Sequence, residues 1–272
     1  MKERVITCML LLLVFTASGC QRSFLYSATS ADLSEEDLAE ISAANVAIMG
    51  VYSILNTSGV SFQINAVPVH APGDRTRCLE ALKRINQAIR LTQSATAYET
   101  VLREQRLAEM RFLRGYFYLD LQNRNHRRNE AEEMDTLTSA QAWTIVEADF
   151  KMGTTVLGSQ AEAPTRFDAW AYLCKAYYLQ KKWTAVIDAA DGALLALKDN
   201  VGEKRALYQD ILLWKAEAAI ELADFKTGQQ LLKQVMQIGG PASNQDSMPL
   251  FDCYECAREV IAAASKVNQG RF

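Results

Sequence analysis

Histidine, glycine and proline are scarce in this sequence of 272 residues, and neither sign of charge dominates it. The two histidines, His70 and His126, are too few for a His-rich metal site and disfavour most His-dependent catalysis. With 13 glycines and 5 prolines, a collagen-like repeat, a β-sandwich and a long disordered tail are disfavoured. Lys and Arg total 29 against 32 Asp and Glu, so no basic surplus is present to neutralise nucleic-acid phosphates. No nucleic-acid partner is therefore expected.

Apolar residues make up 49% of the chain and charged residues 22%, the proportions of a folded globular protein. The sequence has no Gly-x-Ser-x-Gly, no His-Glu-x-x-His and no glycine-rich phosphate loop. Acidic residues occur on nearly every expected helix, but their order singles out no catalytic pair. We therefore expect no enzymatic activity and no cofactor.

The N-terminal segment, Met1–Cys20, has the organisation of a bacterial lipoprotein signal. Charged residues at positions 2–4 precede an apolar run, Val5–Phe15, that is too short to span a bilayer. Ala17-Ser18-Gly19-Cys20 has the form of a lipobox, in which Cys20 is lipidated and becomes the new N-terminus. Several acyl chains anchor a protein stably, since each buried CH₂ contributes roughly 0.8 kcal/mol. A plain secretory signal followed by a chance cysteine is the alternative.

These features divide the chain into three parts. Residues 1–19 are the expected lipoprotein signal peptide, residues 20–33 a polar tether, and residues 34–272 a single helical-repeat domain. Gln21 stands where an inner-membrane retention signal has Asp, so lipid anchoring in the outer membrane is the expected location. No later stretch has 18 uncharged apolar residues, and the body of the protein is expected to be tethered to the membrane without crossing it.

Apolar residues recur at three- and four-residue spacing through most of the chain, and no strand alternation interrupts them. The fold class expected is all-α. Loops are expected at residues 56–77, which contain glycines and prolines, and in the charged stretch 122–135. The expected helices span approximately residues 34–55, 78–91, 98–123, 138–157, 168–180, 183–197, 207–222, 225–238 and 250–266.

The helix expected at 98–123 carries two apolar stripes and should contact neighbours on two sides. The first stripe consists of Met110, Leu113, Phe117 and Leu121, and the second of Phe112, Tyr116 and Leu119.

Internal similarity predicts stacked antiparallel helix pairs of the tetratricopeptide type. One copy of that pattern places Trp170, Leu173, Tyr177, Trp183 and Ala193 at its fixed positions, with Cys174 in place of the usual Gly and Val186 in place of the usual Ala. Trp183 and Phe225 correspond in the two copies, and their separation exceeds the usual repeat length by about eight residues, which are expected near 199–204. The second copy consists of Leu212, Ala216, Ala219, Phe225 and Leu232.

Three segments resemble the SusD/RagB family of outer-membrane nutrient-binding lipoproteins. Glu109–Leu121 resembles that family's E-x-R-F-L-R-A-Y-x-Y-x-x-L helix, with Gly115 where Ala is usual. Thr144–Phe150 is similar to its I-x-x-D-L helix, and Arg166–Val186 resembles its A-x-A-L-x-A-R-x-Y-L-y-x-x-x-W-x-x-A repeat. The likeness covers roughly residues 20–200 of a chain shorter than the family's usual members.

The resemblance implies a non-enzymatic binding protein that sits on a TonB-dependent (SusC-like) outer-membrane transporter and delivers an oligosaccharide or peptide to it. Its helical repeats would face the transporter while loops hold the ligand. The alternative is a helical-repeat lipoprotein that scaffolds envelope proteins without binding a small ligand.

Ligand contacts are expected in the long loop, where an aromatic residue and polar groups occur without being required for helix packing. A loop that merely packs Phe62 inward is the alternative. For Trp170, Trp183, Tyr116 and Tyr177, helical spacing favours a role in the core. The candidate ligand-binding residues are Phe62, Asn65, His70, Asp74 and Arg75.

The cysteines give no metal site by spacing. Cys253 and Cys256 lie in an expected helix without a second ligand pair nearby, so an incidental role is favoured over a disulfide, a metal site or a redox site. Cys174 lies on an apolar helix face, where a buried thiol packs as a small hydrophobe. The sequence does not place Cys78.

Overall fold

The structure is a computed structural model that describes residues 33–57, 75–128, 137–158, 164–197 and 204–238. Within these ranges the regular structure is helical and no strand occurs, which confirms the all-α prediction. The helices are α2 (Glu35–Thr57), α3 (Arg75–Ser94), α4 (Thr100–Arg128), α5 (Ser139–Val156), α6 (Arg166–Leu179), α7 (Trp183–Leu197), α8 (Arg205–Glu221) and α9 (Phe225–Gln237).

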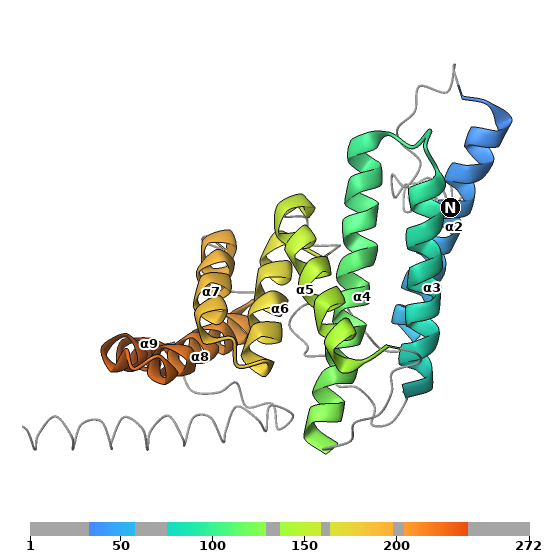
Figure 1. Cartoon of the computed structure of the whole chain (residues 1–272). Coiled ribbons are helices and arrows are strands. Elements are labelled where there is room, and N and C mark those ends of the chain that lie inside the picture. Colours follow the sequence, from blue (N-terminus) through green and yellow to red (C-terminus); the bar gives the residue numbers. More distant parts are fainter. Residues whose placement is uncertain (1–32, 58–74, 129–136, 159–163, 198–203, 239–272) are drawn as a thin grey trace, which may run out of the picture.

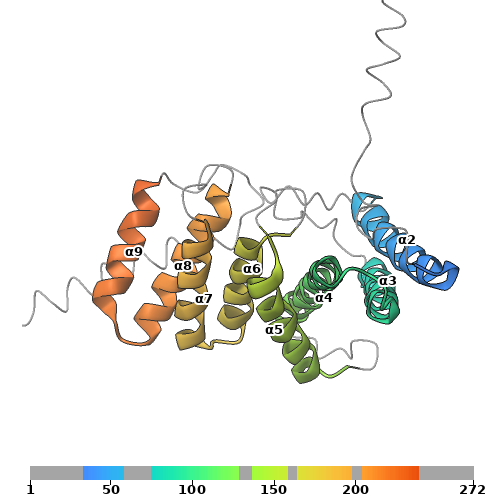
Figure 2. The ribbon, with the colours of Figure 1, turned by 90° about the horizontal axis from the view of Figure 1, so that it is seen from above.

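Figures 1 and 2 show the helices following one another in a row, each beside the next in sequence. The most extensive packing joins α2 to α3, α4 to α5, α6 to α7 and α8 to α9. The first helices of the last three pairs also contact one another, α4 with α6 and α6 with α8. The axes turn along the row, so that α8 and α9 lie across the direction of α3 and α4 (Figure 1). This is the stacking of helix pairs that the sequence predicts.

Side-chain caps fix where several helices begin. Thr138 and Gln141 form a reciprocal capping box at α5, and Thr165 and Asp168 form another at α6. The Asp224 carboxylate accepts a hydrogen bond from the Thr227 amide at the start of α9. These caps satisfy amide groups that the first helical turn leaves without partners.

The turns within the last two pairs are the same structure, at corresponding positions of the two repeat copies. Lys181 and Ala223 both have positive φ, at 56° and 64°, in the left-handed region. After each of them, a backbone amide reaches back five residues: Lys182 N donates to Tyr177 O at 3.0 Å and Asp224 N to Ala219 O at 2.8 Å. The two copies of the predicted repeat therefore end their first helix in the same way.

The same two repeat positions also meet within each of these pairs. The Cys174 thiol donates to the Val186 carbonyl at 3.6 Å, and a Cβ on Gly228 would lie 3.2 Å from the Ala216 carbonyl. Ala216 takes the place of Cys174 in the second copy, and Gly228 the place of Val186. Small side chains at these positions let the two helices approach closely.

Aromatic and aliphatic side chains from consecutive helices fill a continuous core. The two stripes predicted for α4 are both buried, and Phe112 on α4 contacts the rings of Phe150 on α5 and Tyr172 on α6. Both faces of α4 are thus covered, as expected for an inner helix. Cys174 is fully buried, which raises the pKa of its thiol and confirms its packing role.

Two predicted loop boundaries are wrong. Helix α4 continues to Arg128 instead of ending near residue 123. The buried Gln122 amide, placed in the loop predicted at 122–135, lies within this helix and donates to the Ser139 carbonyl of α5 at 2.9 Å. Arg75 begins α3, so it belongs to a helix and not to the loop predicted at 56–77. The expected helix at 250–266, with Cys253 and Cys256, lies outside the described residues.

Candidate functional site

Most residues predicted to act from the sequence lie outside the described part of the chain: Cys20, Phe62, Asn65, His70 and Asp74. Arg75 is described, at the first position of α3, where it is partly exposed. The structure therefore leaves this candidate ligand edge untested.

The motif residues that carry the family resemblance have structural roles in the described helices. Arg114 on α4 donates two hydrogen bonds to the Asp149 carboxylate on α5, at 2.7 and 2.8 Å. Burial raises the pKa of Asp149, while the hydrogen bonds and charge of Arg114 oppose that rise. Glu109 accepts hydrogen bonds from Arg106 and from Tyr52 on α2, which ties α2 to α4.

The predicted core role of four aromatic residues is confirmed. Tyr116 and Tyr177 are buried, and Trp170 and Trp183 are half-buried against the core. The Trp170 ring lies against Gly192 on α7, and the Trp183 ring lies 6.0 Å from that of Tyr178. These residues hold neighbouring helices together.

A different surface joins polar and aromatic side chains, and we name it the α6/α8 face. It consists of half-buried residues that recur at helical spacing on two neighbouring first helices of pairs. Its members are Tyr172, Lys175 and Tyr178 on α6 and Asp210, Trp214 and Glu217 on α8.

Direct contacts link the two halves of the α6/α8 face. The Tyr178 hydroxyl donates to a Glu217 carboxylate oxygen at 2.6 Å, and the ring centroids of Tyr178 and Trp214 are 6.0 Å apart. The positive charge of Lys175 acts on Asp210 across the same boundary. The stripes on α6 and α8 therefore face each other.

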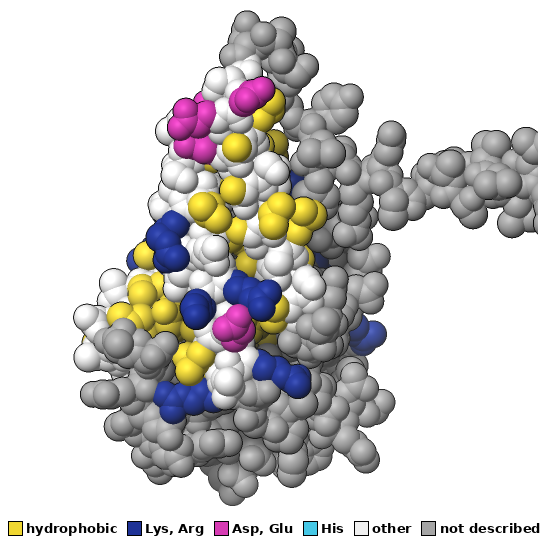
Figure 3. Space-filling view, turned by 90° about the vertical axis from the view of Figure 1, so that its right-hand side faces the viewer, with side chains coloured by type: hydrophobic (Ala, Val, Ile, Leu, Met, Phe, Trp, Pro, Cys, Tyr) yellow, Lys and Arg dark blue, Asp and Glu magenta, His cyan; other side chains and the backbone are white. Residues whose placement is uncertain are grey.

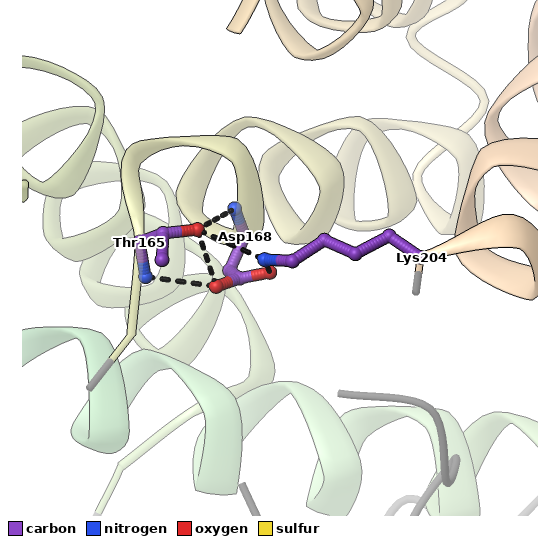
Figure 4. Close-up of polar contacts among 3 residues, drawn as sticks. All are labelled: Thr165, Asp168 and Lys204. Atoms are coloured by element: carbon purple, nitrogen blue, oxygen red, sulfur yellow. Dashed lines mark hydrogen bonds and ion pairs between the residues drawn. The ribbon is translucent and has the colours of Figure 1, made fainter. Parts of the chain in front are cut away.

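Two aspartates at equivalent repeat positions, Asp168 and Asp210, have opposite environments. Asp168 is saturated: it accepts from the Thr165 amide at 2.8 Å, from the Thr165 hydroxyl at 2.6 Å and from the Lys204 ammonium at 3.0 Å (Figure 4). Figure 4 shows these donors converging on the carboxylate from the start of α6 and from the residue preceding α8. Asp168 is therefore part of the helix cap.

Asp210 lacks such partners. Its Oδ1 atom is buried and accepts no hydrogen bond within the described residues. Burial raises the pKa of Asp210 to about 7, an effect that the charge of Lys175 partly offsets. A buried carboxylate oxygen without a donor is costly.

The negative charges of three carboxylates act on the phenol of Tyr172. Burial raises the pKa of its phenol, and the charges of Asp168, Asp210 and Asp120 raise it further. The phenol is therefore neutral at physiological pH and able to donate a hydrogen bond. The rings of Tyr178 and Trp214 lie beside these polar groups. Ligand sites commonly combine flat apolar surface with a few oriented polar groups, and this face has both.

The sequence does not reveal the α6/α8 face, because its residues have the spacing of ordinary helix faces. A signal was present in the alignment of the two repeat copies, since Asp168 and Asp210 have the same offset as Trp183 and Phe225. The donors of Asp168 are Thr165, three residues earlier in its capping box, and Lys204, whose approach from 36 residues away only the fold determines.

A second surface lies at the end of the row formed by α2 and α3 (Figure 3). Three large apolar side chains on one face of α2 are about half exposed: Leu38 at 50%, Val46 at 59% and Met49 at 51%. Figure 3 shows hydrophobic side chains between an acidic group at one end and Lys and Arg toward the other. The acidic residues of the first turn of α2 are Glu35, Glu36 and Asp37.

Comparison with known proteins adds no identification, since the sequence matches no protein-family model and no curated protein. Among the described helices, none is long and apolar enough to cross a membrane. Within the same residues, no group of three or more His, Cys, Asp or Glu side chains is placed to hold a metal ion.

Proposed function

We propose that this protein is an outer-membrane lipoprotein that binds an oligosaccharide or peptide and delivers it to a TonB-dependent transporter. The α6/α8 face is the observation that carries the proposal, because it combines half-buried aromatic rings with half-buried polar side chains. The lipobox at Cys20 and the three family-like segments support the location and the role.

The packing of the family-like segments gives independent support. Residues from separate family-like segments contact each other in the fold. Arg114 of the first segment donates two hydrogen bonds to Asp149 of the second. Phe150 of the second segment contacts the ring of Tyr172 of the third, 5.9 Å between centroids. The three short motifs thus form one packed unit. A shared scaffold explains this better than a separate chance likeness in each motif.

The apolar surface on α2 is suited to docking on the transporter. The expected lipid anchor, Cys20, precedes Glu35, the first residue of α2, by 15 positions in the sequence. An integral membrane protein is therefore the partner nearest to Leu38, Val46 and Met49. Because α2 carries four acidic residues and no basic one, it is less suited to an anionic lipid surface.

The experiment has two parts. Isothermal titration of the purified protein against a panel of oligosaccharides and peptides tests for ligand binding. Affinity purification from detergent-solubilised membranes tests for a β-barrel partner. Comparing the wild type with Val46→Asp tests whether that partner docks on α2. The proposal expects a saturable ligand and a co-purifying transporter that Val46→Asp removes.

The scaffold alternative is favoured by one observation, the exposed apolar residues of α2. It shares the expected protein partner but expects no small ligand. If an envelope protein co-purifies and no oligosaccharide or peptide of the panel binds, the scaffold role is supported and nutrient binding is contradicted.

A further inference from the structure

Helix α9, the last described helix of the row, has an apolar face that is partly exposed (Figure 2). Phe225 is 50% exposed and Met236 is 49% exposed, and both lie on the same side of the helix as the buried Leu232. We name these three residues the α9 stripe. Among the described elements, the extensive packing of α9 is with α8 alone. Within the described residues, the two ends of the α9 stripe therefore stay half exposed to solvent.

The preceding pair has apolar residues at the same repeat positions, and there they are covered. Phe225 corresponds to Trp183, 42 residues earlier, and Met236 corresponds to Leu194 at the same separation. Trp183 is half-buried against the core, and the half-buried Leu194 packs against the apolar cluster of α8 and α9. In a row of stacked pairs, each pair buries its open face against the next one. The α9 stripe is therefore a surface suited to a further first helix.

The sequence after α9 repeats the pattern of a first helix at the same separation of 42 residues. The expected helix at 250–266 lies outside the described residues, so this comparison is one of sequence alone. Four positions keep either the aspartate or an apolar residue in all three copies: Asp168, Asp210 and Asp252; Trp170, Leu212 and Tyr254; Ala176, Ala218 and Val260; Tyr177, Ala219 and Ile261.

One residue departs from this pattern. Arg258 stands at the place of Cys174 and Ala216, which are small and buried. That position meets the second helix of its own pair, as the approaches to Val186 and Gly228 show, and not the pair before it. The departure therefore does not affect packing against α9.

We propose that residues 250–266 form the first helix of a further pair and pack on the α9 stripe, closing this end of the row. The intervening residues 239–249 can span about 36–40 Å, whereas the 13 residues of α9 extend over about 20 Å. The segment can thus reach the whole stripe. A segment of the same chain is also present at an effective concentration on the order of millimolar, which favours it over a free partner.

Two cysteines of this segment report on the packing. Cys253 takes the place of Ile211, which is fully buried in the continuous core. Cys256 takes the place of Trp214, which is half-buried. The inference therefore predicts a well-protected thiol at Cys253 and a less protected one at Cys256. The buried Cys174 of α6 is an internal reference for the fold.

The experiment measures the alkylation rate of each cysteine in the purified full-length protein by peptide-resolved mass spectrometry. A phosphine reductant is present, so that no disulfide hides a thiol. We expect Cys253 in the folded wild type to react at least about tenfold more slowly than in urea, and more slowly than Cys256. Alkylation of Cys253 in the folded wild type at the rate found in urea would overturn the inference, and so would faster reaction at Cys253 than at Cys256.

Substitutions on α9 test whether the protection comes from the stripe. Phe225→Asp combined with Met236→Asp should raise the rate at Cys253 at least about tenfold while Cys174 stays protected. Gln230→Asp adds the same charge at an exposed position of α9 outside the stripe and should leave the rate unchanged. Protection of Cys253 that survives the double substitution would contradict the proposed contact.

Two further outcomes are separated by the same samples. Protection of Cys253 that light scattering finds only in a dimer, and that the α9 substitutions abolish together with the dimer, would assign the stripe to a second copy and overturn the inference. If Cys174 also reacts in the double variant, that variant has lost its fold, and the wild-type rates decide. Ligand and transporter binding enter none of these measurements, so the inference stands or falls separately from the proposed function.

Discussion

Lys181 and Ala223, at corresponding positions of two successive helix pairs, adopt the same left-handed backbone conformation where the first helix of each pair ends. Each is followed by the same backward hydrogen bond, to Tyr177 in one turn and to Ala219 in the other. A shared turn at a shared offset shows that the two helix pairs are copies of one structural unit. Glycine is the residue best suited to this conformation, and neither turn has it.

Glycine at either turn should therefore stabilise the fold. A left-handed residue with a side chain costs about 1–2 kcal/mol, of which glycine recovers a part after its own entropy cost. We expect Lys181→Gly and Ala223→Gly each to raise the free energy of unfolding by about 0.5–1 kcal/mol, measured by urea denaturation. Lys226→Gly, at an exposed helical position of α9, is the control and should lower it by about 1 kcal/mol. A loss of stability at both turns would argue against the shared conformation.

Two glycines separate close packing from simple helix propensity. A Cβ on Gly192 would lie 2.6 Å from the Trp170 ring, whereas a Cβ on Gly50 of α2 would meet nothing within 4 Å. Gly192→Ala should thus cost about 1–3 kcal/mol through overpacking, and Gly50→Ala should add about 0.5–1 kcal/mol. Thermal unfolding followed by circular dichroism measures both. The interpretation fails if the two substitutions shift the melting temperature in the same direction.

Arg114 and Asp149 should behave as a coupled pair. Removing the guanidinium with Arg114→Met leaves a buried carboxylate alone, and we expect a loss of about 3–5 kcal/mol. The double variant Arg114→Met with Asp149→Leu should be more stable than Arg114→Met, because neither charge is then left buried. A double-mutant cycle of chemical denaturation gives the coupling energy. Additive effects of the two substitutions would show that the pair does not contribute as a unit.

Asp210 predicts how stability depends on pH. Burial raises its pKa from the ordinary 3.8 to about 7, so between these values the folded state binds more protons than the unfolded state. Protonated Asp210 contributes fully to the free energy of unfolding below the unfolded-state pKa. This contribution, at most about 4 kcal/mol, is lost as the pH rises through about 7. Relative to Asp210→Asn, the wild type should thus lose stability between pH 4 and pH 8. Parallel curves for the two proteins across this range would refute the assignment.

The sequence predicts most of the fold because the helix signals are local. The two stripes of α4 follow from the spacing of apolar residues alone. On α2 the spacing of apolar residues is a poorer guide to burial: Leu38 and Ile48 both belong to the series that recurs every three or four residues, yet Leu38 is half exposed and Ile48 is buried. The direction in which a helix faces depends on its neighbours, and a helix at the end of a row has fewer of them.

The candidate site is harder to predict, because it depends on contacts between distant residues. Asp168 and Asp210 have the same place in the repeat, but Asp168 accepts from Thr165, for which the second copy has Leu207, and from Lys204, which is 36 residues later in the sequence. Asn45 gives a second example, since its position in an apolar stripe does not reveal that it accepts from the Tyr98 hydroxyl at 2.6 Å.

Trp214 offers the most direct test of ligand binding on the α6/α8 face. Isothermal titration with a ligand from the oligosaccharide and peptide panel should show saturable binding to the wild type and at least about tenfold weaker binding to Trp214→Leu, which keeps the apolar bulk and removes the aromatic ring. Unchanged affinity in a folded Trp214→Leu variant would place the ligand elsewhere. A wild-type protein that binds no panel member would contradict the account altogether.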